Sequence, residues 1–165
     1  MEVIIVGVAV FVISQYFLKL IIEPILEFKK IISQICFHLD YYLAHYTNVT
    51  TFYSKGKRRD DLSEQANQEF DNMRKECKSL ALKLRTHVET IVFFDIITNF
   101  FSPIFNIPKK ENVENAITTL IQINNMSSFD LQEFNPTPGK NPNIQMRDKI
   151  DNVKRYLKSS KKENL

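Results

Sequence analysis

Three histidines and two cysteines are the residues of this chain best suited to metal binding or nucleophilic chemistry. His38 and His45 lie seven residues apart in a helical pattern, which separates them by about 10.5 Å along a helix axis. One metal ion cannot be bound by two side chains so far apart. We therefore expect both histidines to pack beside an apolar seam, partly buried, and we expect no metal site.

The cysteines and the third histidine do not form a catalytic pattern. Cys36 and Cys77 sit among apolar residues, without the spacing of a zinc site or of a secreted disulfide framework, so we expect reduced packing residues. His87, Glu89 and Asp95 lie near Cys77 in the sequence, but a catalytic Cys/His pair needs a spatial contact that the pattern does not predict. The sequence favours a protein that is not an enzyme and has no cofactor.

Glycine usage excludes two classes of nucleotide-binding enzyme. A P-loop or a dinucleotide fingerprint needs several glycines in one short loop. The chain has only three glycines, Gly7, Gly56 and Gly139, and they lie far apart. Thirteen Phe and six Tyr in 165 residues supply ample packing material. Together these features favour an all-α fold.

Positive charge gathers in two stretches, although the net charge is only +3. Residues 55–59 contain four cations, and residues 140–165 hold eight Lys or Arg against three Asp or Glu. Beside a membrane anchor such segments attract anionic lipids. Basic segments that lie beside aromatic side chains can instead bind single-stranded nucleic acid, because the aromatic rings stack on bases. The sequence leaves both partners open, anionic lipid and nucleic acid. The candidate ligand-binding residues are Lys55, Lys57, Arg58, Arg59, Lys75, Lys78 and Arg85, of which the last three share one face of a predicted helix.

The stretch from Val3 to Ile22 predicts one transmembrane helix. Fourteen of its 20 residues are Leu, Ile, Val or Phe, and Lys19 is its only charged residue. As a helix it is about 30 Å long, the thickness of a hydrocarbon core. Glu2 before the run and "FLKLIIEP" near its end are unlike a cleavable signal, so we expect a retained anchor. The alternative is a buried helix of a soluble protein.

The lysines near this helix predict its orientation. No Lys or Arg precedes the run, whereas Lys19, Lys29 and Lys30 lie at or after its end. By the positive-inside rule, we expect the N-terminus to face outward and the rest of the chain to lie in the cytoplasm.

Four polar residues in or beside the span are the candidates for a conducting path: Ser14, Gln15, Lys19 and Glu23. Polar groups as deep as Ser14 and Gln15 usually face another helix or a water-filled path. Alternatively they are tolerated, because Ser readily bonds its own backbone. Lys19 and Glu23, one turn apart, would form charged rings at a pore mouth in an oligomer. Otherwise they are an interfacial anchor and the residue that ends the span.

The remainder reads as amphipathic helices. We expect Pro24 to kink or break the chain where the span ends. A heptad-like seam then predicts a helix of about 22 residues, and a second helix, N-capped by Asp61 with Glu64 as its return partner, packs antiparallel to it. The two seams are Ile25, Phe28, Ile32, Ile35, Leu39, Tyr42 and Tyr46, and then Ala66, Phe70, Met73, Cys77, Leu80, Leu84 and Val88.

Ile91 to Ile107 is the second most apolar stretch. Because Asp95 lies near its centre, we expect it to pack in the core or on the bilayer surface rather than to span. A third helix follows from Glu111 to Asn125, with Val113, Ala116, Ile117, Leu120, Ile121 and Asn124 on one face, and a short basic helix runs from Ile144 to Leu157. The expected organisation is a transmembrane helix (1–24), a cytoplasmic helical domain (25–128), a linker (129–143), and a short basic helix with a tail (144–165).

Two segments, "QYFLKLIIEPILEFKKIISQICFHLDYY" and "ECKSLALKLRTHVETIVFFDIITNFFSPIFNIPKKENVENAITTLIQINN", carry a resemblance. Residues 10–126 resemble small single-span membrane effectors of bacterial phage-defence operons, in particular the Hailong-type effector. The likeness is architectural. It implies an oligomeric ion channel in the inner membrane of a bacterium, held inactive by DNA oligomers that a partner nucleotidyltransferase makes, with the span as the pore.

The sequence thus leads us to expect a homo-oligomer, for instance a tetramer, in contact with membrane lipids. Its expected function is that of a gated ion channel in anti-phage defence, controlled by a cytoplasmic anionic oligonucleotide. The alternative is a non-enzymatic adaptor whose span only tethers a soluble partner to the membrane.

Overall fold

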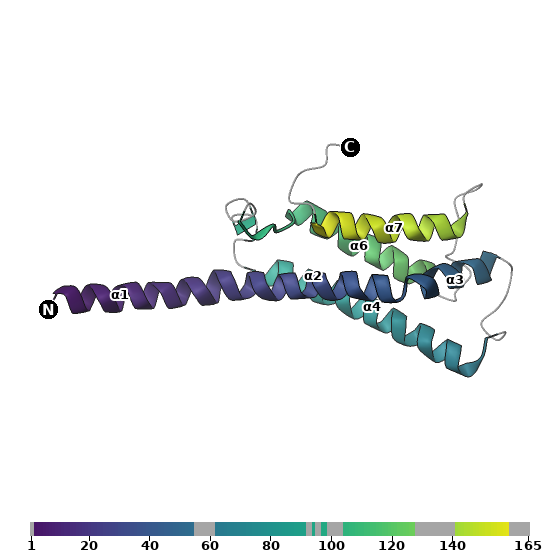
Figure 1. Ribbon diagram of the computed structural model, residues 1–165, viewed down its shortest axis with the longest axis horizontal. Coiled ribbons are helices and arrows are strands. Elements are labelled where there is room, and N and C mark those ends of the chain that lie inside the picture. Colours follow the sequence, from purple (N-terminus) through teal and green to yellow (C-terminus); the bar gives the residue numbers. More distant parts are fainter. Residues whose placement is uncertain are drawn as a thin grey trace.

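The chain folds as an all-helical protein with a long N-terminal helix that projects from a packed set of shorter ones (Figure 1). The computed structural model describes residues 2–54, 62–91, 94, 97–98, 104–127 and 141–158. The projecting part consists of α1 (Glu2–Phe17) and the π-helical turn η1 (Leu18–Ile22), which we call the arm. It continues directly into α2 (Glu23–Tyr41).

Pro24 does not break this helix, so the helix continues where the alternative of a break was predicted. In an α-helix, proline lacks the amide that would bond the carbonyl four residues back, and its ring clashes with that carbonyl. Here the turn before it widens, and the Glu23 amide donates to the Leu18 carbonyl five residues back. The π turn therefore accommodates Pro24, and the helix continues.

The α2 helix buries the predicted seam with one shift. Ile25, Phe28, Ile35 and Leu39 are fully buried, but Ile31 is more buried than the predicted Ile32. The single predicted helix is in fact two. The regular helix ends at Tyr41, Tyr42 adopts φ −95° and ψ 8°, and α3 (Leu43–Ser54) follows.

The predicted antiparallel partner is α4 (Glu64–Thr90), which runs back along α2 (Figure 1). Its buried side chains are Met73, Cys77, Leu80, Ala81, Leu84 and Val88, which confirms most of the predicted seam. The predicted cap is wrong. The N-cap is Ser63, whose side chain accepts a hydrogen bond from the Ala66 amide, and Asp61 lies outside the described residues.

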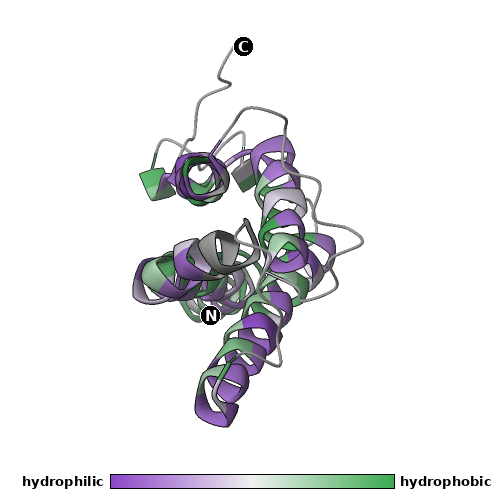
Figure 2. Cartoon of the chain, turned by 90° about the vertical axis from the view of Figure 1, so that its right-hand side faces the viewer, coloured by the Kyte–Doolittle hydropathy of each residue, from purple (hydrophilic) through white to green (hydrophobic). Residues whose placement is uncertain are grey.

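Two further helices complete the core. The α6 helix (Lys110–Met126) packs on α4, and α7 (Pro142–Lys158) packs on α6 and α3. The last helix begins two residues earlier than predicted, and Asn141 Oδ1 accepts from the Asn143 amide at 2.9 Å beside its start. Met146, Ile150, Val153 and Leu157 of α7 belong to the same hydrophobic core as α2 and α4. In the end-on view of Figure 2, these helices carry both hydrophobic and hydrophilic residues, as amphipathic packing requires. We call α2, α3, α4, α6, α7 and the segment joining α4 to α6 the packed domain.

The described part of the second apolar stretch packs mainly in this core. Ile91, Phe94 and Ile97 are buried, and the Phe94 ring meets Phe28 of α2 edge on at 5.4 Å. Ile107 is also buried. Asp95 lies outside the described residues.

Candidate functional site

The arm is long and apolar enough, together with the start of α2, to cross a membrane. The candidate span lies within the continuous helix Ile4–Tyr41, and none of its most apolar window is buried against the rest of the protein. Large side chains such as Phe11 and Ile13 are 63% and 68% exposed. Residues 4–20 are exposed on every side of the arm, whereas at its end the half-buried Ile21 packs against the core.

The four pore candidates occupy different situations on the arm. Ser14 donates its hydroxyl to the Val10 carbonyl at 2.7 Å, so this polar group is already bonded within its own helix. Gln15, Lys19 and Glu23 are exposed and spaced four residues apart. Four residues of α-helix turn through about 400°, so such a row drifts by about 40° per step. The wider π turn rotates less per residue, which brings Gln15, Lys19 and Glu23 nearer to one line than an α-helix would.

The second candidate is a cleft between α4 and α6 with a volume of about 200 Å³. Two of the predicted ligand-binding residues, Lys78 and Arg85, border it from α4. They are seven residues apart, or about 10.5 Å along the axis. Lys75 lies outside this cleft and borders an adjoining surface hollow with Lys78. The structure therefore brings Lys78 and Arg85 to one cleft and leaves Lys75 beside it.

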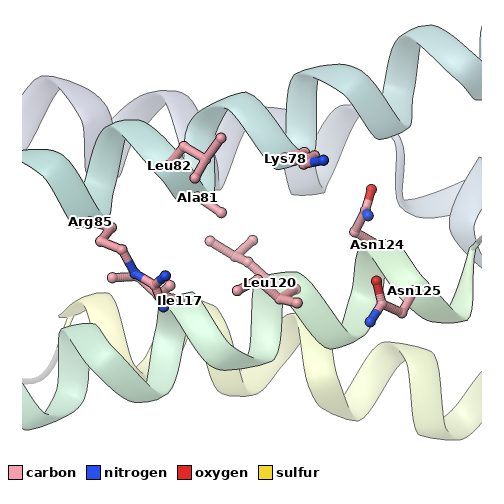
Figure 3. A pocket seen from close by; sticks show the side chains of 9 residues that line it. Lys78, Ala81, Leu82, Arg85, Ile117, Leu120, Asn124 and Asn125 are labelled. Atoms are coloured by element: carbon pink, nitrogen blue, oxygen red, sulfur yellow. The ribbon is translucent and has the colours of Figure 1, made fainter.

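The floor of the α4–α6 cleft is apolar and its rim is polar. Figure 3 shows Ala81, Leu82 and Leu120 between the two cations, with the Arg85 side chain extending from α4 toward Ile117 of α6. Asn124 and Asn125 lie at the Lys78 end. An anion with a flat apolar part fits this chemistry, because the cations attract its charge and the amides donate and accept hydrogen bonds.

Two features limit the cleft as a site for nucleic acid. None of its described lining residues is a Phe or Tyr, so the predicted stacking partners are missing there. Beyond Arg85, the next hollow is bordered by Glu89 and Glu114 as well as Lys110, so the positive charge does not continue unopposed along α6. The other four predicted ligand residues, Lys55, Lys57, Arg58 and Arg59, lie outside the described residues.

A buried polar cluster joins α2, α3 and α4. His38 is 2% exposed, its Nε2 lies 3.0 Å from the Tyr46 hydroxyl in a hydrogen bond, and Glu76 Oε2 lies 3.4 Å from its Nδ1. A carboxylate beside Nδ1 favours a proton there, so Tyr46 donates its hydroxyl to Nε2. Burial lowers the pKa of the His38 imidazole, and Glu76 opposes part of that shift. His38 is thus more buried than predicted, and it fastens the joint between α2 and α3.

Neither cysteine has the environment of a nucleophile. Cys77 is fully buried and its thiol donates to the Leu120 carbonyl at 3.8 Å, which links α4 to α6. Burial raises the pKa of the Cys77 thiol and also that of the half-buried Cys36. Because the thiolate is the reactive form of cysteine, a raised pKa favours the unreactive, protonated thiol. Both cysteines are free, and the predicted packing role agrees with full burial of Cys77 and partial burial of Cys36.

The other two histidines face single carboxylates. His45 Nε2 lies 3.7 Å from Glu69 and His87 Nε2 lies 3.2 Å from Glu27. Within the described ranges, no group of three or more His, Cys, Asp or Glu side chains is placed to hold a metal ion.

Sequence reasoning missed most of the cleft. Leu82 and Ile121 are 52% and 40% exposed and line it, although Ile121 was expected on the core face. Asn125 was assigned no role. The available signal was Leu82, an apolar residue that falls outside the seam of its helix.

Comparison with known protein families, with curated proteins and with solved structures finds no match to this chain.

Proposed function

We propose that this protein is an oligomeric membrane effector, a gated ion channel whose packed domain controls its arm. One observation carries the proposal. The helix that would cross the membrane continues without a break into α2, and α2 contributes Ile25, Phe28 and Ile35 to the domain core. A tether needs no such rigid continuation, whereas a gate requires one.

The proposed mechanism follows from this continuity. A tilt or rotation of α2 against α4 moves the arm as well, because a helix transmits rotation along its axis. In a parallel assembly of several copies, the row Gln15, Lys19 and Glu23 lines the path at its cytoplasmic end. A ligand that favours one arrangement of the domains shifts the equilibrium between closed and open arms by its difference in affinity.

The α4–α6 cleft is the proposed ligand site. Its two cations and two amides, over an apolar floor, fit an anion with a flat apolar part, and a base attached to a phosphate has both. The bacterial setting, a role in defence against phage and a nucleotidyltransferase partner are proposed from the sequence resemblance.

The test of gating is ion flux through the purified full-length protein in liposomes. Leu18→Gly with Leu20→Gly makes the link flexible, since each glycine costs about 1 kcal/mol in a helix interior. Both leucines are exposed, so the domain core is untouched. We expect flux that no longer responds to added short single-stranded DNA, whereas the matched pair Leu18→Ala and Leu20→Ala still responds. An equal response in both pairs, or no flux from any variant, contradicts the proposal.

Ligand binding is tested separately with the same DNA probe. Lys78→Gln with Arg85→Gln removes two charges from the cleft, and Lys83→Gln with Lys158→Gln removes two exposed charges elsewhere. We expect only the first pair to reduce the slope of log affinity against log salt, by about 0.7 per lost phosphate contact. Equal slopes for the two pairs remove the cleft from the proposal.

The adaptor function has one observation in its favour. The hydrogen bond from Ser14 to Val10 is what a passive anchor would show, because it leaves no unsatisfied group to face a pore. For an adaptor, Gln15→Leu leaves partner binding intact and no variant conducts ions. For a channel, the same substitution alters conductance.

A further inference from the structure

In the described part of the chain between α4 and α6, one large apolar side chain is uncovered. Ile104 is 73% exposed, while Ile97 and Ile107 on either side of it are 5% and 1% exposed. Asn106 has φ 48°, in the left-handed region that Asn tolerates better than most residues. This turn lets Ile107 and Pro108 enter the core while Ile104 stays outside.

This segment lies at the end of the packed domain from which the arm projects. Upstream of it, Phe94 meets Phe28, and His87 lies 3.2 Å from Glu27, so the chain leaving α4 runs beside the first turns of α2. In Figure 1 the teal-green segment before α6 lies at that same end of the domain. The first turns of α2 directly follow the candidate span.

Four lysines lie on this segment and on the first turns of α2. Lys109 and Lys110 begin α6, and Lys29 and Lys30 lie on the neighbouring part of α2, where both are exposed. Within the described part of the chain no ion pair engages any of the four. The acids nearby are Glu23, Glu27, which faces His87, and Glu111.

We propose that residues 104–110 form a membrane-surface contact that takes an anionic lipid surface as its partner. Ile104 enters the boundary between headgroups and acyl chains, and Lys109 and Lys110 contact lipid phosphates together with Lys29 and Lys30. The domain then touches the bilayer at a second point besides the arm. This contact restricts how α2 can tilt. The inference depends on membrane insertion of the arm, which belongs to the proposed function.

The chain contains no tryptophan, so a single introduced one reports its own surroundings. Three full-length variants in vesicles of brominated lipid test the contact: Ile104→Trp, Ile13→Trp in the arm, and Phe37→Trp, which replaces a 70% exposed residue further along α2. Quenching of Ile13→Trp tests insertion by itself. We expect Ile104→Trp to be quenched in phosphatidylserine-containing vesicles, and Phe37→Trp not to be.

The lysines are tested in the Ile104→Trp background. Lys109→Gln with Lys110→Gln should lower the ratio of lipid-contacting to free protein about fivefold per lysine. Salt at about 1 M, which reduces the Debye length to about 3 Å, should also lower this ratio. Lys149→Gln with Lys158→Gln on α7 is the matched control and should change nothing.

The possible results separate the two proposals. If Ile13→Trp is quenched while Ile104→Trp behaves like Phe37→Trp, the surface contact is refuted and the span remains. If Ile104→Trp shifts to a blue emission without quenching, its partner is a protein, which also refutes a lipid contact. If Ile13→Trp is not quenched either, membrane insertion itself fails.

Discussion

The arm and α2 are two halves of one helix, yet they distribute apolar residues in opposite ways. In the arm, Ile5, Phe11 and Ile13 are 65%, 63% and 68% exposed, whereas Ile25 and Phe28 in α2 are each 1% exposed. On α2 most apolar residues lie on the face that packs in the core, although Leu26 and Phe37 are exposed, and on α1 they occupy every face. A helix that is apolar all round needs an apolar surround, whereas a one-sided helix needs a core. Within a few residues of η1, the composition of this helix thus changes from one suited to an apolar surround to one suited to a protein core.

The largest expected difference between the two halves concerns phenylalanine. Phe28→Ala removes a buried ring packed against Phe94, and we expect it to lower the free energy of unfolding of the packed domain by about 3–5 kcal/mol. Phe11→Ala removes an exposed ring from the arm and should weaken insertion by about 0.3–0.6 kcal/mol without changing domain unfolding. Urea unfolding of the full-length protein in detergent micelles measures the first effect. A similar decrease in the free energy of unfolding for both variants would mean that the arm packs on the domain.

A second difference is pH dependence, which only the domain should show. Because burial lowers the pKa of His38, the unfolded chain takes up a proton that the folded one refuses. Domain stability should therefore be constant above the ordinary histidine pKa of 6.5 and should fall as the pH drops below it. The groups facing His38 are Glu76 from α4 and Tyr46 from α3.

The variant His38→Gln checks this dependence through unfolding measured across that pH range. We expect the stability of His38→Gln to depend less on pH than that of the wild type. Identical profiles for His38→Gln and the wild type would assign the pH dependence to other groups.

The smallest effect compares two serines. Ser63→Ala removes the cap of α4 and should cost about 1 kcal/mol of domain stability, because an amide at that helix start loses its partner. Ser14→Ala removes a hydroxyl that bonds only its own helix, so domain stability should not change. Thermal unfolding with circular dichroism detection distinguishes them. If Ser63→Ala leaves the thermal stability of the domain unchanged, another residue caps α4.

The sequence predicted the all-helical fold and most core positions because burial repeats with the period of the helix. The burial of Met73, Cys77 and Leu84 was predicted from their spacing along the helix alone. Ile32 was predicted in place of Ile31 because two adjacent isoleucines fit the seam equally well, and packing in the core decides between them. The π turn was missed because proline predicts a break, and its accommodation depends on a local widening that composition does not encode.

The candidate cleft was less predictable. Lys78 and Arg85 were expected on one face because they are on one helix, and they do border the cleft. Asn125 and Leu82 come from different helices, so their meeting depends on how α6 docks on α4. The hydrogen bond between His38 and Tyr46 was missed for a related reason. It joins α2 to α3 across Tyr42, where the sequence pattern predicted one continuous helix.

The π turn at Leu18–Ile22 contains one residue more than a turn of α-helix. One residue of α-helix corresponds to about 100° of rotation. If the widened turn moved along the chain, or closed, the arm would swivel about its own axis while α2 kept its place in the core. In the proposed oligomer, such a swivel would change which side chains of neighbouring arms meet, without unwinding the helix.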